Sequence, residues 1–442
     1  MEQGALNKEQ GKVLFFPIFL ASTFSNFLDC VSILLDEMIV GNLFDDTAFG
    51  AINVIEPFQM IETFLAYMIC IGGVAMIIRA DGQKSYERIN ELFSHSITSC
   101  LLLGVIFFMI YSLFGNPMAK AVAGETETLP YVLQVISWNR LDALVEPTYV
   151  FLFTYVLLRG GSFYALFVTI LEIALNFLLS VVLGKMMGIG GVVLATGIAF
   201  CIGILLLILF LFLKKEPIKV RPLFKAGLIK EMTVISFSEG SIVLAFAFME
   251  AVTNQTSLTY YGIQGIAVAA VVINVFEIVI YVSEGISEYE TAALNEYIGR
   301  EDKDKVLQCM RVAIRAAVLE GAVFSILYFT MADTLVSLFD INDPLTGELA
   351  VKAVKMIAAT PVIICLTRIF AIFYQYTKRV RRAAFLVIMS WGLLPALFVW
   401  LFGQIAIEGV TLGLILGSSV ALFLMLLYVR GLKKEKFLEY KK

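Results

Sequence analysis

The stretch at residues 189–213 reads IGGVVLATGIAFCIGILLLILFLFL and contains no charged side chain. About 20 apolar residues in a helix cross the ~30 Å hydrocarbon core of a bilayer. A strand of a membrane β-barrel would instead alternate polar and apolar residues over about ten positions. This stretch therefore predicts a transmembrane helix.

Apolar stretches of similar length recur along the whole chain, separated by short polar breaks. The 442 residues are 60% hydrophobic and only 16% charged, which leaves too few polar groups to cover a water-soluble surface. We predict an all-α membrane protein with twelve transmembrane helices, a multi-pass protein of the cell membrane. The predicted spans are residues 13–41, 48–78, 89–114, 130–157, 162–185, 189–213, 231–257, 262–290, 306–332, 350–376, 383–403 and 407–430.

Basic residues gather on one side of these predicted spans. Most of the 33 Lys and Arg side chains lie before the first span, in alternate loops and after the last span. Such residues mark the cytoplasmic side of a membrane protein. We therefore expect the N- and C-termini in the cytoplasm, which agrees with an even number of spans.

The composition argues against several other classes of protein. A net charge of -4 without a basic tail disfavours binding of nucleic acid, whose phosphates require clustered Lys and Arg. The chain has one histidine, His95, and its six cysteines show no C-x-x-C spacing. No pair of nucleophile and base and no phosphate-binding loop stands out. We expect neither an enzyme nor a bound cofactor.

The two halves of the chain resemble each other. Residues 52–56 read INVIE and residues 273–277 read INVFE, which places a polar and an acidic side chain in the middle of a span in each half. Residues 155–216 also align without a gap at a shift of about 219, so that Gly184 pairs with Gly403 and Gly190 with Gly409.

Two six-span halves are expected to form two similar lobes. Because six is even, the second half enters the bilayer in the same orientation as the first, and the lobes are related by a pseudo-twofold axis along the membrane normal. We predict an N-lobe over residues 1–215, a cytoplasmic linker over residues 216–230 and a C-lobe over residues 231–442. A cleft between two such lobes would suit alternating access.

Acidic residues inside the predicted spans outnumber the arginines there. A charge at the bilayer centre costs about 2.5–3.5 kcal/mol on insertion scales, so each needs a partner, water or a function. On span 1, Asp29 and Asp36 lie two turns apart on a face that also carries Ser22, Ser25 and Ser32. On span 5, Glu172 lies one turn before Asn176. Either set could bind a small cation or exchange a proton, although hydration near the interface or interhelical hydrogen bonds would also account for them.

Other polar residues of the spans are candidates for lining the cleft. Span 8 carries a stripe on one helical face, with a shorter counterpart on span 2. The acids nearer the cytoplasmic end could instead reach the headgroups. On span 4, Arg140 could neutralise a neighbouring acid such as Asp142 or contact a substrate. The stripe residues that we expect in the substrate cleft are Asn53, Glu56, Asn274, Glu277, Tyr281 and Glu284.

Several short motifs occur in an order that resembles a known family. Residues 35–42 read LDEMIVGN, residues 79–86 read RADGQKSY, and Leu175-Asn176 is followed by GIGG at residues 188–191 and by Ala195-Thr196. Their order and spacing resemble the multidrug and toxic compound extrusion (MATE) family of the MOP flippase superfamily. The family's twelve spans in two lobes match the count made above.

The resemblance implies export of organic cations in exchange for inward Na⁺ or H⁺. In members with a cation site in the N-lobe, the residues that match Asp36, Asn176 and Thr196 are implicated, so these three are the candidate ligands for Na⁺. Ser180 stands where those members usually carry an aspartate. Glu172 could substitute for that aspartate.

A second arrangement in the family pairs an acid of span 7 with an acid of span 10. Here Glu250 could serve in span 7, but span 10 contains no acid. Arg368 lies in span 10 instead, with no acid in its own span.

We therefore expect a cation-coupled antiporter, driven by H⁺ or Na⁺, that exports hydrophobic, cationic organic compounds by alternating access. It would act as a monomer in the lipid bilayer, with a small-molecule substrate and no nucleic acid. The alternative is a lipid-linked precursor flippase of the same superfold. Such a protein would need a basic cleft for a diphosphate, which the excess of intramembrane acids disfavours. A facilitator-type transporter or a membrane receptor is a further alternative.

Overall fold

The computed structural model describes residues 15–44, 46–123, 128–214, 221, 223–339, 341, 343–377 and 380–430. These residues form helices joined by short turns, and no strand occurs among them. The prediction of an all-α protein is confirmed.

The chain divides into two compact units, each described by itself. One unit comprises Met1–Ser236 with Ile298–Arg300, and the other comprises Phe237–Tyr297 with Glu301–Lys442. Residues 216–220 and residue 222 of the predicted linker lie outside the described residues.

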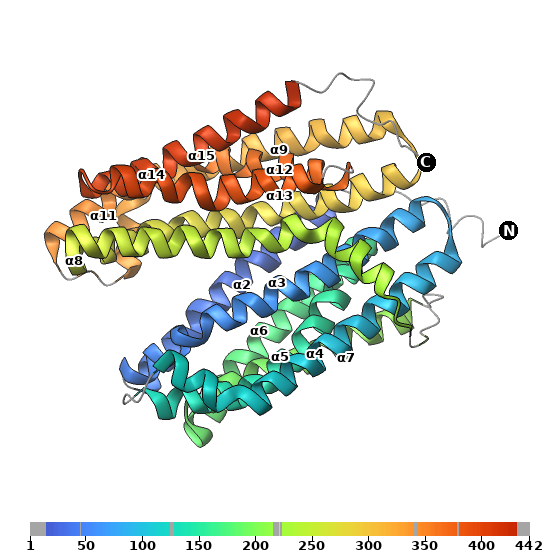
Figure 1. The fold of residues 1–442 in the computed structure, drawn as a ribbon, viewed down its shortest axis with the longest axis horizontal. Coiled ribbons are helices and arrows are strands. Elements are labelled where there is room, and N and C mark those ends of the chain that lie inside the picture. Colours follow the sequence, from blue (N-terminus) through green and yellow to red (C-terminus); the bar gives the residue numbers. More distant parts are fainter. Residues whose placement is uncertain are drawn as a thin grey trace. The chain divides into compact units, whose positions relative to one another are not determined.

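The first unit contains six long helices and the beginning of a seventh, coloured blue to green in Figure 1. The helices are α2 (Phe15–Leu43), α3 (Asp46–Gly82), α4 (Tyr86–Ala123), α5 (Leu129–Val156), α6 (Ser162–Met187), α7 (Ile189–Leu213) and the start of α8 (Ala226–Gly299). A π-helical turn, η1 (Leu157–Gly161), joins α5 to α6.

The second unit contains most of α8 and the helices after it, coloured yellow to red in Figure 1. These are α9 (Lys303–Thr330), α10 (Ala332–Val336), η2 (Ser337–Phe339), α11 (Pro344–Ile357), α12 (Pro361–Tyr376), α13 (Val380–Ile388), η3 (Met389–Leu393), α14 (Leu394–Phe402) and α15 (Ile407–Arg430).

The described helices account for the predicted spans. Ten helical segments are long and apolar enough to cross a membrane, and the bent pair α11 and α12, at 48°, adds an eleventh. One of the ten, Leu129–Met187, has 59 residues, or about 88 Å of helix, which is long enough to cross the ~30 Å hydrocarbon core twice. It is broken at Arg159 and Gly160, which have non-helical dihedral angles, so it supplies two spans and gives twelve in total.

Glycine also divides α8, the longest helix. Gly262 has a φ of 59°, a left-handed conformation that glycine adopts without steric cost. The break separates Ala226–Gly262 from Gln264–Gly299, each of which is long enough to span a membrane.

The first unit buries apolar side chains inside and exposes others outside. Ile39, Ile55 and Phe107 belong to a hydrophobic core formed by α2, α3, α4, α5 and α7. On the opposite face of α4, Leu101 and Ile106 are about half exposed, as expected for a surface in contact with lipid.

The repeat seen in the sequence has a structural counterpart in the turns before α7 and α15. A Cβ atom on Gly191 would overlap the carbonyl oxygen of Leu183, and one on Gly409 would overlap that of Phe402. Both turns thus need glycine at the same place. The sequence alignment paired Gly190 with Gly409. In the structure, Gly191 is the residue that approaches a backbone carbonyl as Gly409 does.

Replacing Gly191 with alanine should force the turn between α6 and α7 apart. Overpacking of this kind costs about 1–3 kcal/mol, so we expect the purified variant to unfold at a lower temperature in detergent. Gly227→Ala is the control, because a Cβ there meets nothing within 4 Å. Equal unfolding temperatures for the two variants would contradict the close approach.

Candidate functional site

Four polar side chains from three helices of the first unit form a hydrogen-bonded cluster. Asn176 Nδ2 donates to Thr196 Oγ1 of α7 at 3.1 Å. Ser180 Oγ lies 2.8 Å from Asn176 Oδ1 and 3.4 Å from Asp36 Oδ1 of α2. We call these four residues the Asp36 cluster.

The Asp36 cluster forms because of helical spacing. Asn176 and Ser180 are one turn apart and share a face of α6, so both can reach α2. Asn176 is 3% exposed and Ser180 is fully buried. Two turns before Asn176 on α6, Thr169 Oγ1 donates a hydrogen bond to Ser25 Oγ of α2 at 3.3 Å. The serine-bearing face of α2 is therefore turned toward α6.

Two further acids lie along the same pair of helices. Glu172 is one turn before Asn176 on α6 and is 6% exposed. Asp29 is two turns before Asp36 on α2, and the two acids Asp29 and Glu172 interact electrostatically. The predicted cation-coupling residues of spans 1, 5 and 6 thus occupy one region of the first unit.

The donor set of the Asp36 cluster suits a proton or a monovalent cation. It offers one carboxylate, one amide oxygen and two hydroxyl oxygens, and hard cations prefer oxygen ligands. A single carboxylate balances one positive charge. Among the described residues, no group of three or more His, Cys, Asp or Glu is arranged to hold a metal ion.

Polar faces of α3 and α5 meet beside this region. Gln59 Nε2 donates to Asn139 Oδ1 at 3.2 Å, and Thr63 Oγ1 donates to Glu146 Oε1 at 3.3 Å. Glu62, one turn from Gln59 on α3, is 5% exposed. Sequence reasoning missed Glu62, although an acid within a predicted span was itself a signal.

The first unit therefore holds several intramembrane carboxylates that no described basic residue neutralises. None of them forms an ion pair within the described residues, where the recorded pairs of this unit involve other acids. The six are Asp29, Asp36, Glu62, Asp142, Glu146 and Glu172. We call them the unpaired acids of the first unit. A buried carboxylate in this situation is stabilised by a proton or a cation.

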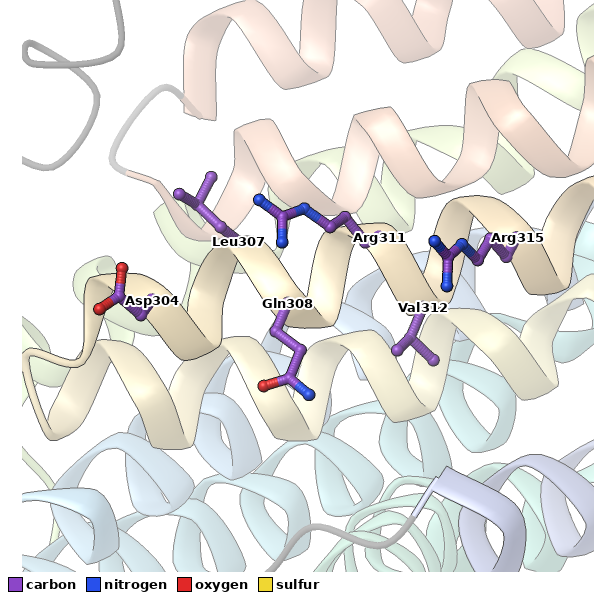
Figure 2. A pocket seen from close by; sticks show the side chains of 6 residues that line it. All are labelled: Asp304, Leu307, Gln308, Arg311, Val312 and Arg315. Atoms are coloured by element: carbon purple, nitrogen blue, oxygen red, sulfur yellow. The ribbon is translucent and has the colours of Figure 1, made fainter.

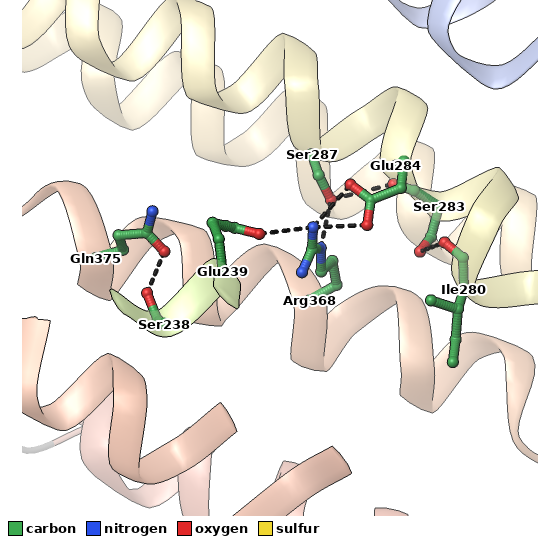
Figure 3. A network of polar contacts seen from close by, with 8 residues as sticks. All are labelled: Ser238, Glu239, Ile280, Ser283, Glu284, Ser287, Arg368 and Gln375. Atoms are coloured by element: carbon green, nitrogen blue, oxygen red, sulfur yellow. Dashed lines mark hydrogen bonds and ion pairs between the residues drawn. The ribbon is translucent and has the colours of Figure 1, made fainter. Parts of the chain in front are cut away.

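In the second unit, two acids form ion pairs with an arginine, as Figure 3 shows. Arg368 of α12 forms ion pairs with Glu239 at 2.8 Å and with Glu284 at 2.7 Å, both acids belonging to α8. Its Nε donates to Ser287 Oγ at 3.2 Å. The side chains of Arg368 and Glu239 are 5% and 6% exposed. We call this set the Arg368 network.

The Arg368 network extends along α12. Ser238, next to Glu239, donates a hydrogen bond to Gln375 Oε1. Glu290 of α8 is fully buried and interacts electrostatically with Arg368, but neither of its carboxylate oxygens has a hydrogen-bond partner among the described residues. Sequence reasoning left Arg368 without a partner, because its acids come from a different helix.

The structure gives mixed results for the residues predicted to line a substrate cleft. Asn274 Nδ2 donates to the carbonyl oxygen of Ala270 on its own helix, and Glu284 belongs to the Arg368 network. Glu250, Glu277 and Tyr281 are half-buried. The side chains of Asn53 and Glu56 lie outside the described residues.

The suggested pairing of Arg140 with an acid of span 4 is wrong. Arg140 Nε donates to the carbonyl oxygen of Ser137, one turn earlier, at 2.6 Å. It forms no ion pair within the described part of the chain. A long side chain can satisfy the backbone of its own helix, and spacing alone did not distinguish this outcome from a salt bridge.

Comparisons with known proteins identify relatives over most of the chain. A sequence model of the MatE family matches residues 21–182 and 242–401. The chain is 23% identical over 402 residues to the multidrug export protein MepA of Staphylococcus saprophyticus, covering 90% of this chain and 88% of that protein. It is 28% identical over 335 residues to the probable multidrug resistance protein YoeA of Bacillus subtilis, covering 71% and 70%. A solved structure of a MOP superfamily transporter from Pyrococcus furiosus matches with a TM-score of 0.87 and 16% identity over 94% of each chain.

Replacing Arg368 with methionine should destabilise the second unit. The change leaves Glu239 and Glu284 without their partner, and breaking a buried ion pair in this way costs about 3–5 kcal/mol. We expect a much lower unfolding temperature in detergent. Adding Glu239→Gln and Glu284→Gln to the same chain should recover most of the loss.

The control for this prediction is Arg381→Met on an exposed position of α13. It removes the same charge and should leave the unfolding temperature unchanged. An Arg368→Met variant as stable as this control would show that the network does not hold α8 and α12 together.

Proposed function

This chain belongs to the MatE family of membrane transporters, and from that premise we propose that it is a multidrug exporter coupled to an inward flow of H⁺ or Na⁺. The relatives of known name are multidrug export and resistance proteins, and they cover most of the chain. The exported compounds would be hydrophobic organic cations. The observation that carries the proposal is the Asp36 cluster.

Coupling requires that the driving cation favours one conformation over another. A ligand shifts a conformational equilibrium only by its difference in affinity for the two states. The oxygens of the Asp36 cluster come from α2, α6 and α7, so a cation that contacts all of them joins three helices. Any movement of α2 away from α6 would weaken its binding. The cluster can therefore link occupancy to the position of α2.

The choice of the first unit for coupling rests on charge. The unpaired acids of this unit need a proton or a cation, whereas Glu239 and Glu284 of the second unit already have Arg368 as a tethered cation. An external cation would have to displace a guanidinium held by two carboxylates. We therefore assign coupling to Asp36 and not to Glu239 or Glu284 of α8.

The same ion pairs weigh against a lipid-linked precursor flippase. A diphosphate headgroup would need free guanidinium or ammonium groups in the predicted cleft, not on the lipid-facing surface. Arg368 is bound to two acids and Arg140 to a backbone carbonyl. We further propose that the chain acts as a monomer with both termini in the cytoplasm, as the distribution of Lys and Arg predicts.

Asp36→Asn should abolish coupling, because it removes the only carboxylate of the Asp36 cluster while keeping its shape. The measurement is efflux of a fluorescent organic cation from proteoliposomes under an imposed pH or Na⁺ gradient. We expect either gradient to accelerate efflux by the wild type and neither to accelerate it in the variant. Asp333→Asn, on an exposed side chain of the second unit, is the control and should behave as the wild type.

Two results would contradict this assignment. Wild-type efflux that ignores both gradients would exclude cation coupling. Gradient-driven efflux at the wild-type rate by Asp36→Asn would exclude the role of Asp36 and leave another unpaired acid, such as Glu172, as the coupling group.

Ser180→Ala should weaken coupling without abolishing it. It removes one of the four oxygen-bearing groups of the cluster, and one hydrogen bond contributes about 1 kcal/mol, or roughly five-fold in affinity. We expect the cation concentration that gives half-maximal efflux to rise by about that factor, with the maximal rate retained. An unchanged half-maximal concentration would show that Ser180 only holds Asn176 in place.

A further inference from the structure

A shallow groove on α9 of the second unit carries two arginines. The groove has a volume of about 510 Å³ and lies over the first half of the helix, as Figure 2 shows. Its lining residues are Asp304, Leu307, Gln308, Arg311, Val312 and Arg315. All of them belong to α9, so the groove is part of the outer surface of that helix.

Arg311 and Arg315 are exposed and have no recorded partner. They are four residues apart, which places their Cβ atoms about 5–6 Å from each other on one face of the helix. The structure records no ion pair or hydrogen bond from either guanidinium to a described residue. Two neighbouring cations that no described residue neutralises can attract an anion.

The same face continues as an apolar surface toward the other end of α9. Leu319 and Val323 follow Arg315 at intervals of four residues, and their side chains are 68% and 46% exposed. Ile326, one turn after Val323, is 63% exposed. In a membrane protein such a stripe faces acyl chains. The two arginines therefore lie at the N-terminal end of a lipid-facing apolar stripe on α9.

The length of α9 places the arginines near the membrane surface. Its 28 residues extend about 42 Å, some 12 Å more than the hydrocarbon core. If its polar first two turns occupy that excess, Arg311 lies at the boundary of the hydrocarbon and Arg315 lies one turn deeper. An arginine at this depth is costly unless its guanidinium reaches headgroups or meets an anion.

We propose that Arg311 and Arg315 bind the phosphate of an anionic phospholipid, whose acyl chains lie along Leu319 and Val323. Guanidinium groups bind phosphate through paired N–H donors, so two of them at this spacing can hold one phosphate. Gln308 between them and the water can add an amide donor. Asp304 lies about two turns from Arg311 and disfavours an anion at the aqueous end, which directs the phosphate toward the arginines.

The charge distribution indicates which leaflet supplies the lipid. Arg311 and the loop before α9 belong to the side of the membrane on which most Lys and Arg residues lie, and anionic lipids of the cytoplasmic leaflet attract such residues. The inference is independent of the transported compound and of the coupling ion.

Native mass spectrometry of the full chain in detergent tests the proposal. The probes are phosphatidylglycerol and phosphatidylcholine with identical acyl chains, added separately. We expect the wild type to bind phosphatidylglycerol more tightly. Arg311→Gln/Arg315→Gln should reduce this affinity about 25-fold, because each arginine near an anionic lipid contributes about 1 kcal/mol, or five-fold. The single variants should each lose about five-fold.

The matched control is Arg221→Gln/Arg381→Gln, which removes two exposed arginines elsewhere. It should bind phosphatidylglycerol as the wild type does. An equal loss in control and test variants, or no preference of the wild type for the anionic lipid, would overturn the proposal.

A free phosphate is distinguished from a lipid by a second measurement. The lipid should raise the unfolding temperature of the wild type, whereas inorganic phosphate alone should not, because it makes no contact with Leu319 or Val323. Equal stabilisation by inorganic phosphate would overturn the lipid assignment. All exchanged positions are exposed, and the single variants keep the test valid should the double variant unfold.

Discussion

The absence of any described basic partner for six intramembrane carboxylates is the constraint on which the first unit depends. A carboxylate cannot face lipid without a large free-energy penalty, so the helices that carry these acids must turn them inward. Asp36 of α2 contacts Ser180 of α6, and Thr63 of α3 contacts Glu146 of α5. Apolar residues such as Leu101 of α4 then cover the outside. The orientation of each helix about its axis follows from where its polar face must lie, and the hydrophobic effect alone would not fix it, since lipid is as apolar as a leucine side chain.

The two units repeat the fold but not the chemistry. Their turns share the glycine requirement at Gly191 and Gly409, which is a property of backbone packing. Their buried charges differ, because Arg368 supplies the second unit with a cation of its own. A guanidinium bound to Glu239 and Glu284 ties both parts of α8 to α12 and keeps these acids occupied in any cation gradient. The two halves of a duplicated fold can thus have different functions, and ion coupling needs the acids of only one half.

The sequence predicted much of the fold and only part of the candidate site. Apolar stretches and their breaks determine spans because the bilayer sets one length for all of them, and the helical period determines which residues share a face. Asp36 and Asn176 were predicted from their spacing and Thr196 from the family resemblance, and the structure brings the three together. The sequence did not predict which helix each polar face would contact. Arg368 and Glu284 are 84 residues apart in the chain. The helical repeat shows which residues share a face of α8 or α12, but it does not show that these two helices pack against each other. The contacts of Ser180 with both Asn176 and Asp36 were not predicted for the same reason, because they depend on the distance between α2 and α6.

The hydrogen bonds within the Asp36 cluster bear on how a cation could act there. In the described arrangement, Ser180 lies between Asn176 and Asp36, and its single proton can be donated to one of them at a time. A proton on Asp36 would add a donor and let the carboxyl group donate to Ser180, so that the serine proton remains with Asn176. A metal cation would do the opposite, since it needs the oxygens of both residues and would turn the hydroxyl and amide protons away. The two cations would therefore leave different hydrogen-bond patterns between α2 and α6. A cluster of this composition can respond to either, and the free energy available for moving α2 is limited to the difference in binding between its two positions.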